Sequence, residues 1–98
     1  MLGELALVDK NSKIAKSNIL FYETLYDENA SCHIAVGRGF KECLKDSENM
    51  TEQELAEIGY NNSQNHVDLM VGTNDLNITA TTYDNQEILI FKDGSFNI

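Results

Sequence analysis

The sequence contains no proline and no low-complexity stretch or internal repeat. Because linkers between domains are marked by such features, we predict one domain over residues 1–98. It also has no apolar run near the roughly 18 residues that cross a membrane, and its first residues lack the basic start and long apolar centre of a signal peptide. A cytoplasmic protein without membrane association is therefore expected.

Cysteine is scarce, with only Cys32 and Cys43 in the chain. Two such widely spaced residues do not form a disulfide framework or a thiolate zinc site, so we expect both to be reduced. Cys32 lies next to His33, which raises the hypothesis of a nucleophilic cysteine. Adjacent side chains generally point apart and no orienting acid is identifiable, so a small buried thiol is the favoured interpretation.

Basic residues are also few: seven Lys plus Arg against sixteen Asp plus Glu leave a net charge of −9. This balance removes the electrostatic basis for binding nucleic acid or an anionic membrane. An acidic protein suits metal cations or a substrate with a free amine, although high charge also serves solubility alone. A core of this size gives a thin stability margin unless a metal or a partner adds to it.

Two segments predict helices. Residues 19–26 place Phe21 and Leu25 at helical spacing, with a buried strand as the alternative. Thr51 followed three residues later by Glu54 is a capping box, which predicts a short helix over residues 52–58 that ends before Gly59.

The remaining patterns indicate strands. Residues 5–8 are typical of a buried strand end, and residues 66–71 alternate with period two. Residues 76–80 alternate again, 83–85 predict a turn, and 87–92 a further strand, after which Asp93-Gly94 favours a type I′ turn into 95–98. We therefore predict an α+β fold with two or three short helices and a mixed or antiparallel sheet that ends in a β-meander.

Both histidines lie close to carboxylates. A strand directs His66 and Asp68 to the same side, where the pair is either a site for a divalent cation or a hydrogen-bonded surface pair. Glu4 lies in an apolar run, where a charge is costly unless it is paired or coordinated, or unless the start of the chain is frayed. The segment Gly37-Arg38-Gly39 lacks the lysine and hydroxyl residue of a phosphate loop.

Three segments occur in the order and spacing of one family. Residues 2–8, residues 21–37 with the core Asp-Glu-Asn-Ala-Ser-Cys-His-Ile-Ala, and residues 66–72 resemble the aminopeptidase T and aminopeptidase S family. The resemblance implies a site for two divalent ions, zinc, cobalt or manganese, a choice that agrees with oxygen and nitrogen ligands. Its implied ligands are Glu4, Glu28, His33, His66 and Asp68. Glu4 is also the implied catalytic base, unless it is a bridging ligand.

The resemblance also implies an activity. A metal-dependent aminopeptidase would hydrolyse N-terminal residues from peptides with a water activated by two metals, in a homodimeric enzyme. Members are several times longer, so this chain is expected to be a C-terminal, metal-binding portion, with a further glutamate ligand in the part before it. Phe40 stands where the family has a tyrosine. The alternatives are a truncated, non-catalytic metal-binding fragment and an acidic interaction domain.

Overall fold

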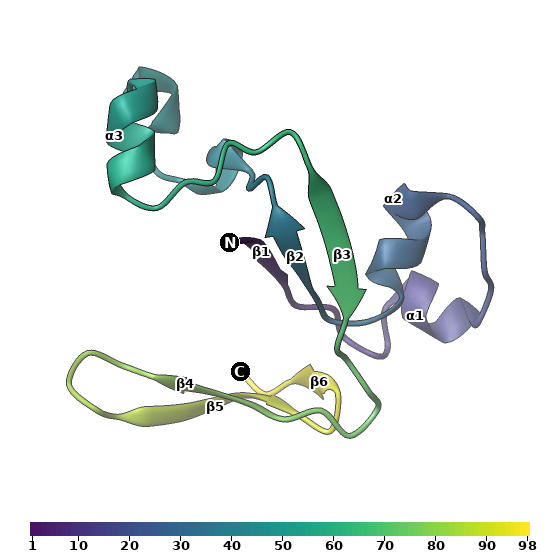
Figure 1. The fold of residues 1–98 in the computed structure, drawn as a ribbon. Helices are drawn as coiled ribbons and strands as arrows, with labels where there is room; N and C mark the ends of the chain where they lie inside the picture. Colours follow the sequence, from purple (N-terminus) through teal and green to yellow (C-terminus); the bar gives the residue numbers. More distant parts are fainter. The chain divides into compact units, whose positions relative to one another are not determined.

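The computed structural model describes residues 1–98 and divides them into two compact units. The first unit comprises Met1–Ala6 and Ile34–Leu69, and the second comprises Leu7–His33 and Met70–Ile98. Three short α-helices and two three-stranded sheets form these units, which confirms the α+β prediction (Figure 1). The single domain expected over residues 1–98 stays a prediction.

The first sheet has the order β1-β2-β3, built from Leu2–Ala6, His33–Gly37 and His66–Met70. Past the end of β2, the Arg38 N–H donates to the Asn65 carbonyl that precedes β3, at 2.6 Å. At the same end of β2, the Gly37 N–H donates to the Met1 carbonyl that precedes β1, at 3.0 Å. Each outer strand therefore runs antiparallel to β2.

One face of this sheet carries apolar side chains that are exposed to solvent. The expected period-two strand over 66–71 is confirmed as β3, but Val67 and Leu69 are 57% and 47% exposed. The buried strand end expected at 5–8 is wrong: the strand is Leu2–Ala6, and Leu5 is 70% exposed. The apolar face of the first sheet thus remains uncovered within this chain.

Helix α3, Glu52–Glu57, confirms the capping-box prediction. The Thr51 hydroxyl oxygen accepts a hydrogen bond from the Glu54 N–H at 3.2 Å. The helix ends before Gly59, whose φ of +94° belongs to the left-handed region that stops helices. Leu55 is its buried residue. Two 3-10 turns, η2 (Lys41–Cys43) and η3 (Ser47–Asn49), precede this helix in the chain.

The helix predicted over residues 19–26 is wrong in its bounds. Helix α2 covers only Thr24–Asp27 and continues into the 3-10 turn η1, Glu28–Ala30. The Asp27 carboxylate accepts hydrogen bonds from the Phe21 and Glu23 N–H groups at 2.8 and 3.2 Å. These bonds compete with helix formation and hold the preceding residues in another conformation.

Helix α1, Lys13–Ser17, was not predicted. Ser12 caps its first turn by accepting from the Ala15 N–H at 3.4 Å, and Asn18 ends it with a φ of 53°. A serine before a short run and an asparagine after it were its only sequence signals. The segment Lys-Ile-Ala-Lys-Ser is too short to show helical periodicity, so the pattern did not reveal it.

The second sheet is the predicted meander, with β4 (Ile78–Thr81), β5 (Glu87–Lys92) and β6 (Ser95–Phe96) in antiparallel order. Lys92 pairs with Ser95 across the turn. Asp93 and Gly94 both have positive φ values, 49° and 78°, as the predicted type I′ turn requires. Phe91 is fully buried and contacts the Phe96 ring, with centroids 4.7 Å apart.

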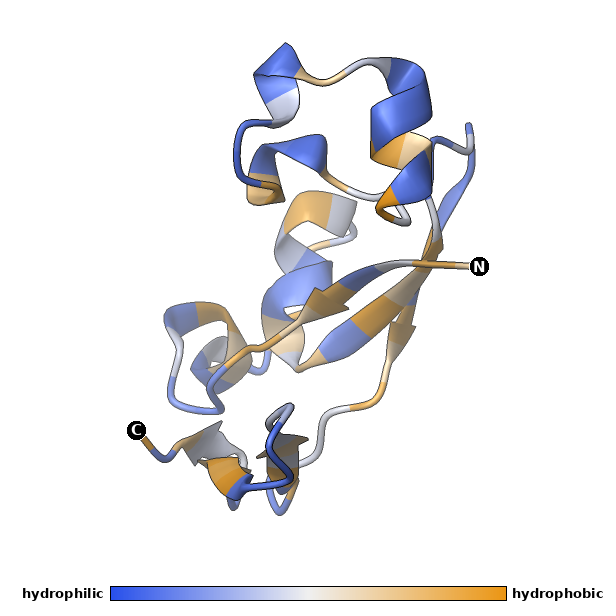
Figure 2. Cartoon of the chain, turned by 90° about the vertical axis from the view of Figure 1, so that its left-hand side faces the viewer, coloured by the Kyte–Doolittle hydropathy of each residue, from blue (hydrophilic) through white to orange (hydrophobic).

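The units bury few apolar side chains. Residues on the helices are mostly hydrophilic, whereas the strands carry both hydrophilic and hydrophobic residues (Figure 2).

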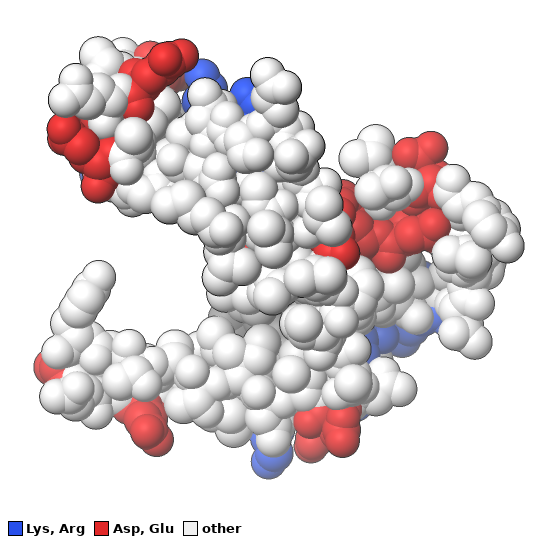
Figure 3. Space-filling view, viewed as in Figure 1, with Lys and Arg blue, Asp and Glu red and all other residues white.

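Acidic groups gather at several places on the face seen in Figure 3, and basic groups are sparse there. None of the helices has the length and apolar character needed to cross a membrane. The buried apolar residues are Cys32, Ala35, Leu55 and Phe91.

Candidate metal site

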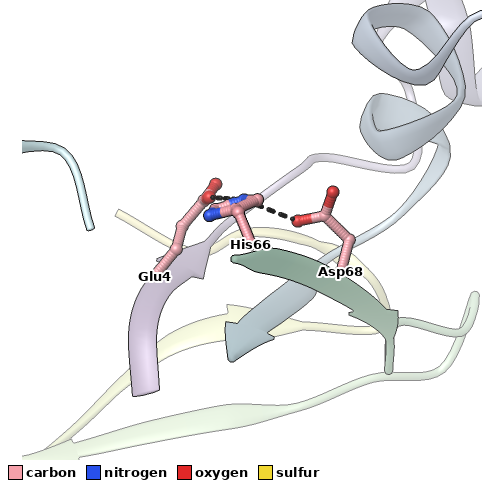
Figure 4. Close-up of side chains that lie close together, drawn as sticks. All are labelled: Glu4, His66 and Asp68. Carbon is pink, nitrogen blue, oxygen red and sulfur yellow. Dashed lines mark hydrogen bonds and ion pairs between the residues drawn. The ribbon is translucent and has the colours of Figure 1, made fainter. Parts of the chain in front are cut away.

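Three of the five predicted ligands meet in the first unit. Glu4 extends from β1, and His66 and Asp68 extend from one face of β3, so the three side chains converge (Figure 4). The His66 Nε2 atom lies 3.2 Å from Glu4 Oε2 and 3.1 Å from Asp68 Oδ1. One possible ligand atom from each residue lies within 4.8 Å of the other two. The pairing of β1 and β3 on either side of β2 creates this convergence.

The other ring nitrogen of His66 is anchored to the backbone. Its Nδ1 atom lies 2.7 Å from the Arg38 carbonyl oxygen, which can only accept, so Nδ1 donates. This bond is the main reason that the pKa of His66 is raised; partial burial opposes the rise, and the charges of Asp68 and Glu4 add to it. Metal-binding histidines commonly donate their second ring N–H to a carbonyl in this way.

Solvent reaches the cluster, because the side chains of His66, Glu4 and Asp68 are 26%, 20% and 14% exposed. Phe40 lies beside His66, with ring centroids 5.6 Å apart in an edge arrangement. A cavity of about 380 Å³ adjoins the ring of His66, and Phe40 and Tyr60 supply its aromatic wall. The cluster therefore lies beside a space that a small ligand can enter.

Glu28 and His33, the other two predicted ligands, belong to the second unit. Glu28 begins η1, and His33 is the first residue of β2 and is only 2% exposed. Their ligand atoms lie within 4.8 Å of one another, and His33 Nδ1 is 3.1 Å from the Ser31 carbonyl oxygen. The structure thus brings the five residues together as a trio and a pair. Their convergence on one cavity stays a prediction.

The trio has the chemistry of a divalent cation site. Two carboxylates and one imidazole, without thiolate, suit zinc, cobalt or manganese. Metal bonds of about 2.0 to 2.2 Å in tetrahedral geometry separate ligand atoms by roughly 3.5 Å, close to the 3.1 and 3.2 Å found here. Small side-chain shifts would suffice to admit a cation. Without one, Nε2–H of a protonated His66 would donate to the two carboxylates at these distances.

Sequence reasoning missed the Arg38 carbonyl as part of this site. The flanking glycines, Gly37 and Gly39, were considered only as a phosphate loop and excluded. Two glycines around one residue were the available signal, because glycine often marks a close approach of backbone. Phe40, which stands where the family has a tyrosine, lies beside His66.

Comparison with known proteins agrees with the family resemblance seen in the sequence. The model of the family described as thermophilic metalloprotease (M29) matches residues 1–96. Aminopeptidase AmpS of Bacillus subtilis is 45% identical over 95 residues, which are 97% of this chain and 23% of that protein. Aminopeptidase T of Thermus aquaticus is 35% identical over 97 residues, again 23% of its length. The chain therefore spans about a quarter of these relatives.

A solved structure shares the fold. The wild-type AmpT from Thermus thermophilus matches with a TM-score of 0.83 and 34% sequence identity, over 99% of this chain and 23% of that one. The family match covers nearly all of the present sequence, and the relatives confirm the resemblance to aminopeptidases T and S. This chain belongs to the thermophilic metalloprotease (M29) family.

Proposed function

We propose that this chain is the metal-binding portion of a metal-dependent aminopeptidase that removes N-terminal residues from peptides. Family membership supports a metallopeptidase, and relatives in the family carry the name aminopeptidase. The observation that carries the proposal is the position of His66: its Nε2 lies between two carboxylates while its Nδ1 donates to a carbonyl. This is the arrangement expected of a metal ligand with a supporting hydrogen bond.

The proposed ligands are those that the family resemblance implies. Glu4, His66 and Asp68 would hold a cation in the first unit, and Glu28 and His33 would complete a set for two cations. Zinc, cobalt and manganese all suit these oxygen and nitrogen donors. When bound, such cations polarise a peptide carbonyl and lower the pKa of water.

The residues of the chain would then bind the substrate and transfer protons. Glu4 is our proposed general base, because its carboxylate lies at the cluster and is partly exposed to solvent. A bridging-ligand role for Glu4 is the alternative. The net charge of −9 would attract the protonated amino terminus of a peptide, which is a physical basis for exopeptidase activity.

A second candidate is a metal-binding fragment without catalytic activity. The observation that favours it is coverage, since the chain corresponds to 23% of its relatives. Ligands or substrate contacts supplied by the rest of such a protein would then be missing. For the complete protein, the homodimer, the cytoplasmic location and the C-terminal position of this portion stay predictions.

Metal binding tests the site directly. Zinc titration of the 98-residue chain by calorimetry should show weak binding that falls about tenfold or more in Glu4→Gln and in Asp68→Asn, because each change removes a charged donor. Glu57→Gln, an exposed change of the same chemistry on α3, should leave the affinity unchanged. Equal affinity in all four proteins would contradict the assignment of Glu4 and Asp68.

An activity assay separates the two candidate functions. The chain alone should not hydrolyse an amino-acyl chromogenic substrate in the presence of zinc, cobalt or manganese, since a site that lacks part of its surroundings does not orient the attacking water. Turnover that depends on added metal and disappears in His66→Ala would overturn this expectation and make the chain a minimal enzyme.

A further inference from the structure

Three backbone segments of the first unit approach too closely to leave room for side chains. A Cβ on Gly37 would lie 2.0 Å from the Asn65 carbonyl oxygen, and Gly37 also has a φ of +108°. A Cβ on Gly3 would lie 2.1 Å from the Gly37 oxygen, and one on Gly39 would lie 2.8 Å from the Gly3 oxygen. Only glycine fits such approaches without displacement of backbone. We call Gly3, Gly37 and Gly39 the glycine clamp.

Hydrogen bonds hold the clamped segment from both sides. The Gly37 N–H donates to the Met1 oxygen at 3.0 Å, and the Arg38 N–H donates to the Asn65 oxygen at 2.6 Å. The Gly39 N–H donates to the Asn61 oxygen at 2.9 Å. Three successive N–H groups are therefore bonded, which restricts rotation of the peptide units that contain them. The position of the Arg38 carbonyl between them is correspondingly restricted.

The Arg38 carbonyl favours a proton on Nδ1 of His66, and so affects whether Nε2 faces the cluster with a lone pair. A neutral imidazole carries one proton, and the hydrogen bond at one nitrogen decides which nitrogen has it. With Nδ1 donating to the Arg38 oxygen at 2.7 Å, a neutral His66 has an unprotonated Nε2. Nε2 is the atom that lies between Glu4 and Asp68. In the neutral ring its lone pair, and in the protonated ring its N–H, faces the point where the carboxylates converge.

We propose that the glycine clamp is a positioning device for metal binding, which places the Arg38 carbonyl so that His66 keeps its proton on Nδ1 and presents Nε2 to a cation. The inference rests on the proposed function for its metal, but not for the geometry of the ring. A side chain at Gly37 would push β2 away from the segment before β3 and so move the carbonyl from Nδ1. Gly37 acts through the carbonyl and His66 and would not contact the metal.

Nitrogen-15 NMR of the metal-free chain tests the ring state. At a pH high enough to keep His66 neutral, wild type should show a protonated Nδ1 and an unprotonated Nε2; the signals of His66 are identified by comparison with His33→Gln, which leaves one histidine. In Gly37→Ala the two nitrogens should become a mixture of both states. Gly59→Ala is the matched control, because Gly59 has a φ of +94° but no atom within 4 Å of an added Cβ.

Zinc affinity is the second measurement. It should fall about 10- to 100-fold in Gly37→Ala, as for other lost supporting contacts of metal ligands, and stay unchanged in Gly59→Ala. If circular dichroism shows that Gly37→Ala does not fold, Gly39→Ala takes its place, since its contact of 2.8 Å is less severe.

Two results would overturn the proposed role of the glycine clamp. The first is an unchanged His66 ring state and zinc affinity in the clamp variant. The second is an equal loss of zinc affinity in Gly59→Ala, which would indicate general strain. If the wild-type chain binds no zinc, the proposed function fails. The ring-state comparison would then still support or overturn the positioning of His66.

Discussion

Phe40 shows how one atom affects the expected chemistry. Its ring lies edge-on to the ring of His66, one of the proposed ligands, with centroids 5.6 Å apart. The resemblance implies tyrosine at this position, and phenylalanine lacks the hydroxyl that could donate to a developing oxyanion. The side chain retains the packing contact with His66 and loses the polar function.

Phe40→Tyr should therefore raise turnover of a complete protein that contains this chain by about 100- to 1,000-fold, since one oriented donor is worth about 2.7 to 4 kcal/mol in the transition state. Zinc affinity of the isolated chain should stay nearly constant. Steady-state kinetics and calorimetry measure the two quantities. Unchanged or lower turnover would remove position 40 from the mechanism.

Asp9 is a second residue of interest, because its side chain joins segments that are far apart in the sequence. Its carboxylate accepts from the N–H groups of Asn11 and Phe96 at 2.8 and 2.9 Å and from the Ser95 hydroxyl at 3.2 Å. The pKa of Asp9 is lowered, first by the hydrogen bond from Asn11 and then by the one from Phe96. The ionised form thus connects the first loop of the second unit to β6.

The lowered pKa predicts a pH dependence of stability. The contribution of Asp9 should be present above its ordinary value of 3.8 and lost as pH falls through the lower value of the folded state. Asp9→Asn should destabilise the protein at neutral pH and reduce the loss of stability in acid. Urea unfolding at pH 7 and at pH 3 measures both. A steeper acid loss in the variant would contradict the assignment.

At the scale of elements, hydrogen bonds between residues close in the sequence stabilise the short helices. Helix α3 has six residues and buries only Leu55, so neither length nor packing contributes much. The Thr51 cap satisfies the Glu54 N–H, one of the free donors of the first turn. Its contribution should accordingly be a large fraction of the stability of α3.

Thr51→Ala should cost about 1 kcal/mol and speed amide hydrogen exchange throughout α3. Thr51→Ser is the control, because serine keeps the hydroxyl and caps about as well. Hydrogen exchange followed by NMR distinguishes α3 from the strands. Equal exchange in Thr51→Ala and Thr51→Ser would show that the cap is unimportant.

For the whole molecule, exposed apolar surface dominates the expected behaviour. Leu5, Val67 and Leu69 are exposed on β1 and β3, which are the outer strands of the first sheet. Adjacent strand residues alternate between faces, so these side chains point away from the face that carries Glu4, His66 and Asp68. Open edges and apolar faces of this kind favour association.

The isolated chain should therefore associate as its concentration rises. Leu5→Lys and Leu69→Lys together should reduce this association while changing the free energy of unfolding by no more than about 0.5 kcal/mol per site, as is usual for surface positions. Ile58→Lys, which alters an equally exposed residue outside the sheet, is the control. Sedimentation velocity over a concentration series measures the effect. A monomer at all concentrations would contradict the expectation.

Features encoded by neighbouring residues were predictable. The capping box before α3, the period-two pattern of β3 and the Asp93-Gly94 turn all appear in the structure, because each depends on backbone preferences within a few positions. The helix over 19–26 failed because the Asp27 side chain bonds back to Phe21 and Glu23. Such a bond competes with helical periodicity and is not visible in it.

One part of the candidate site was likewise predictable from neighbouring residues, and the other part was not. Residues two apart on a strand share a face, so His66 and Asp68 were a pair before any fold was known. Glu4 is 62 positions from His66, and the Arg38 carbonyl belongs to the backbone rather than to a residue type, so no local pattern joins them. The antiparallel pairing of β1, β2 and β3 brings both within hydrogen-bonding distance of one imidazole ring. Strand pairing depends on contacts between distant residues, and those are made only when the chain folds.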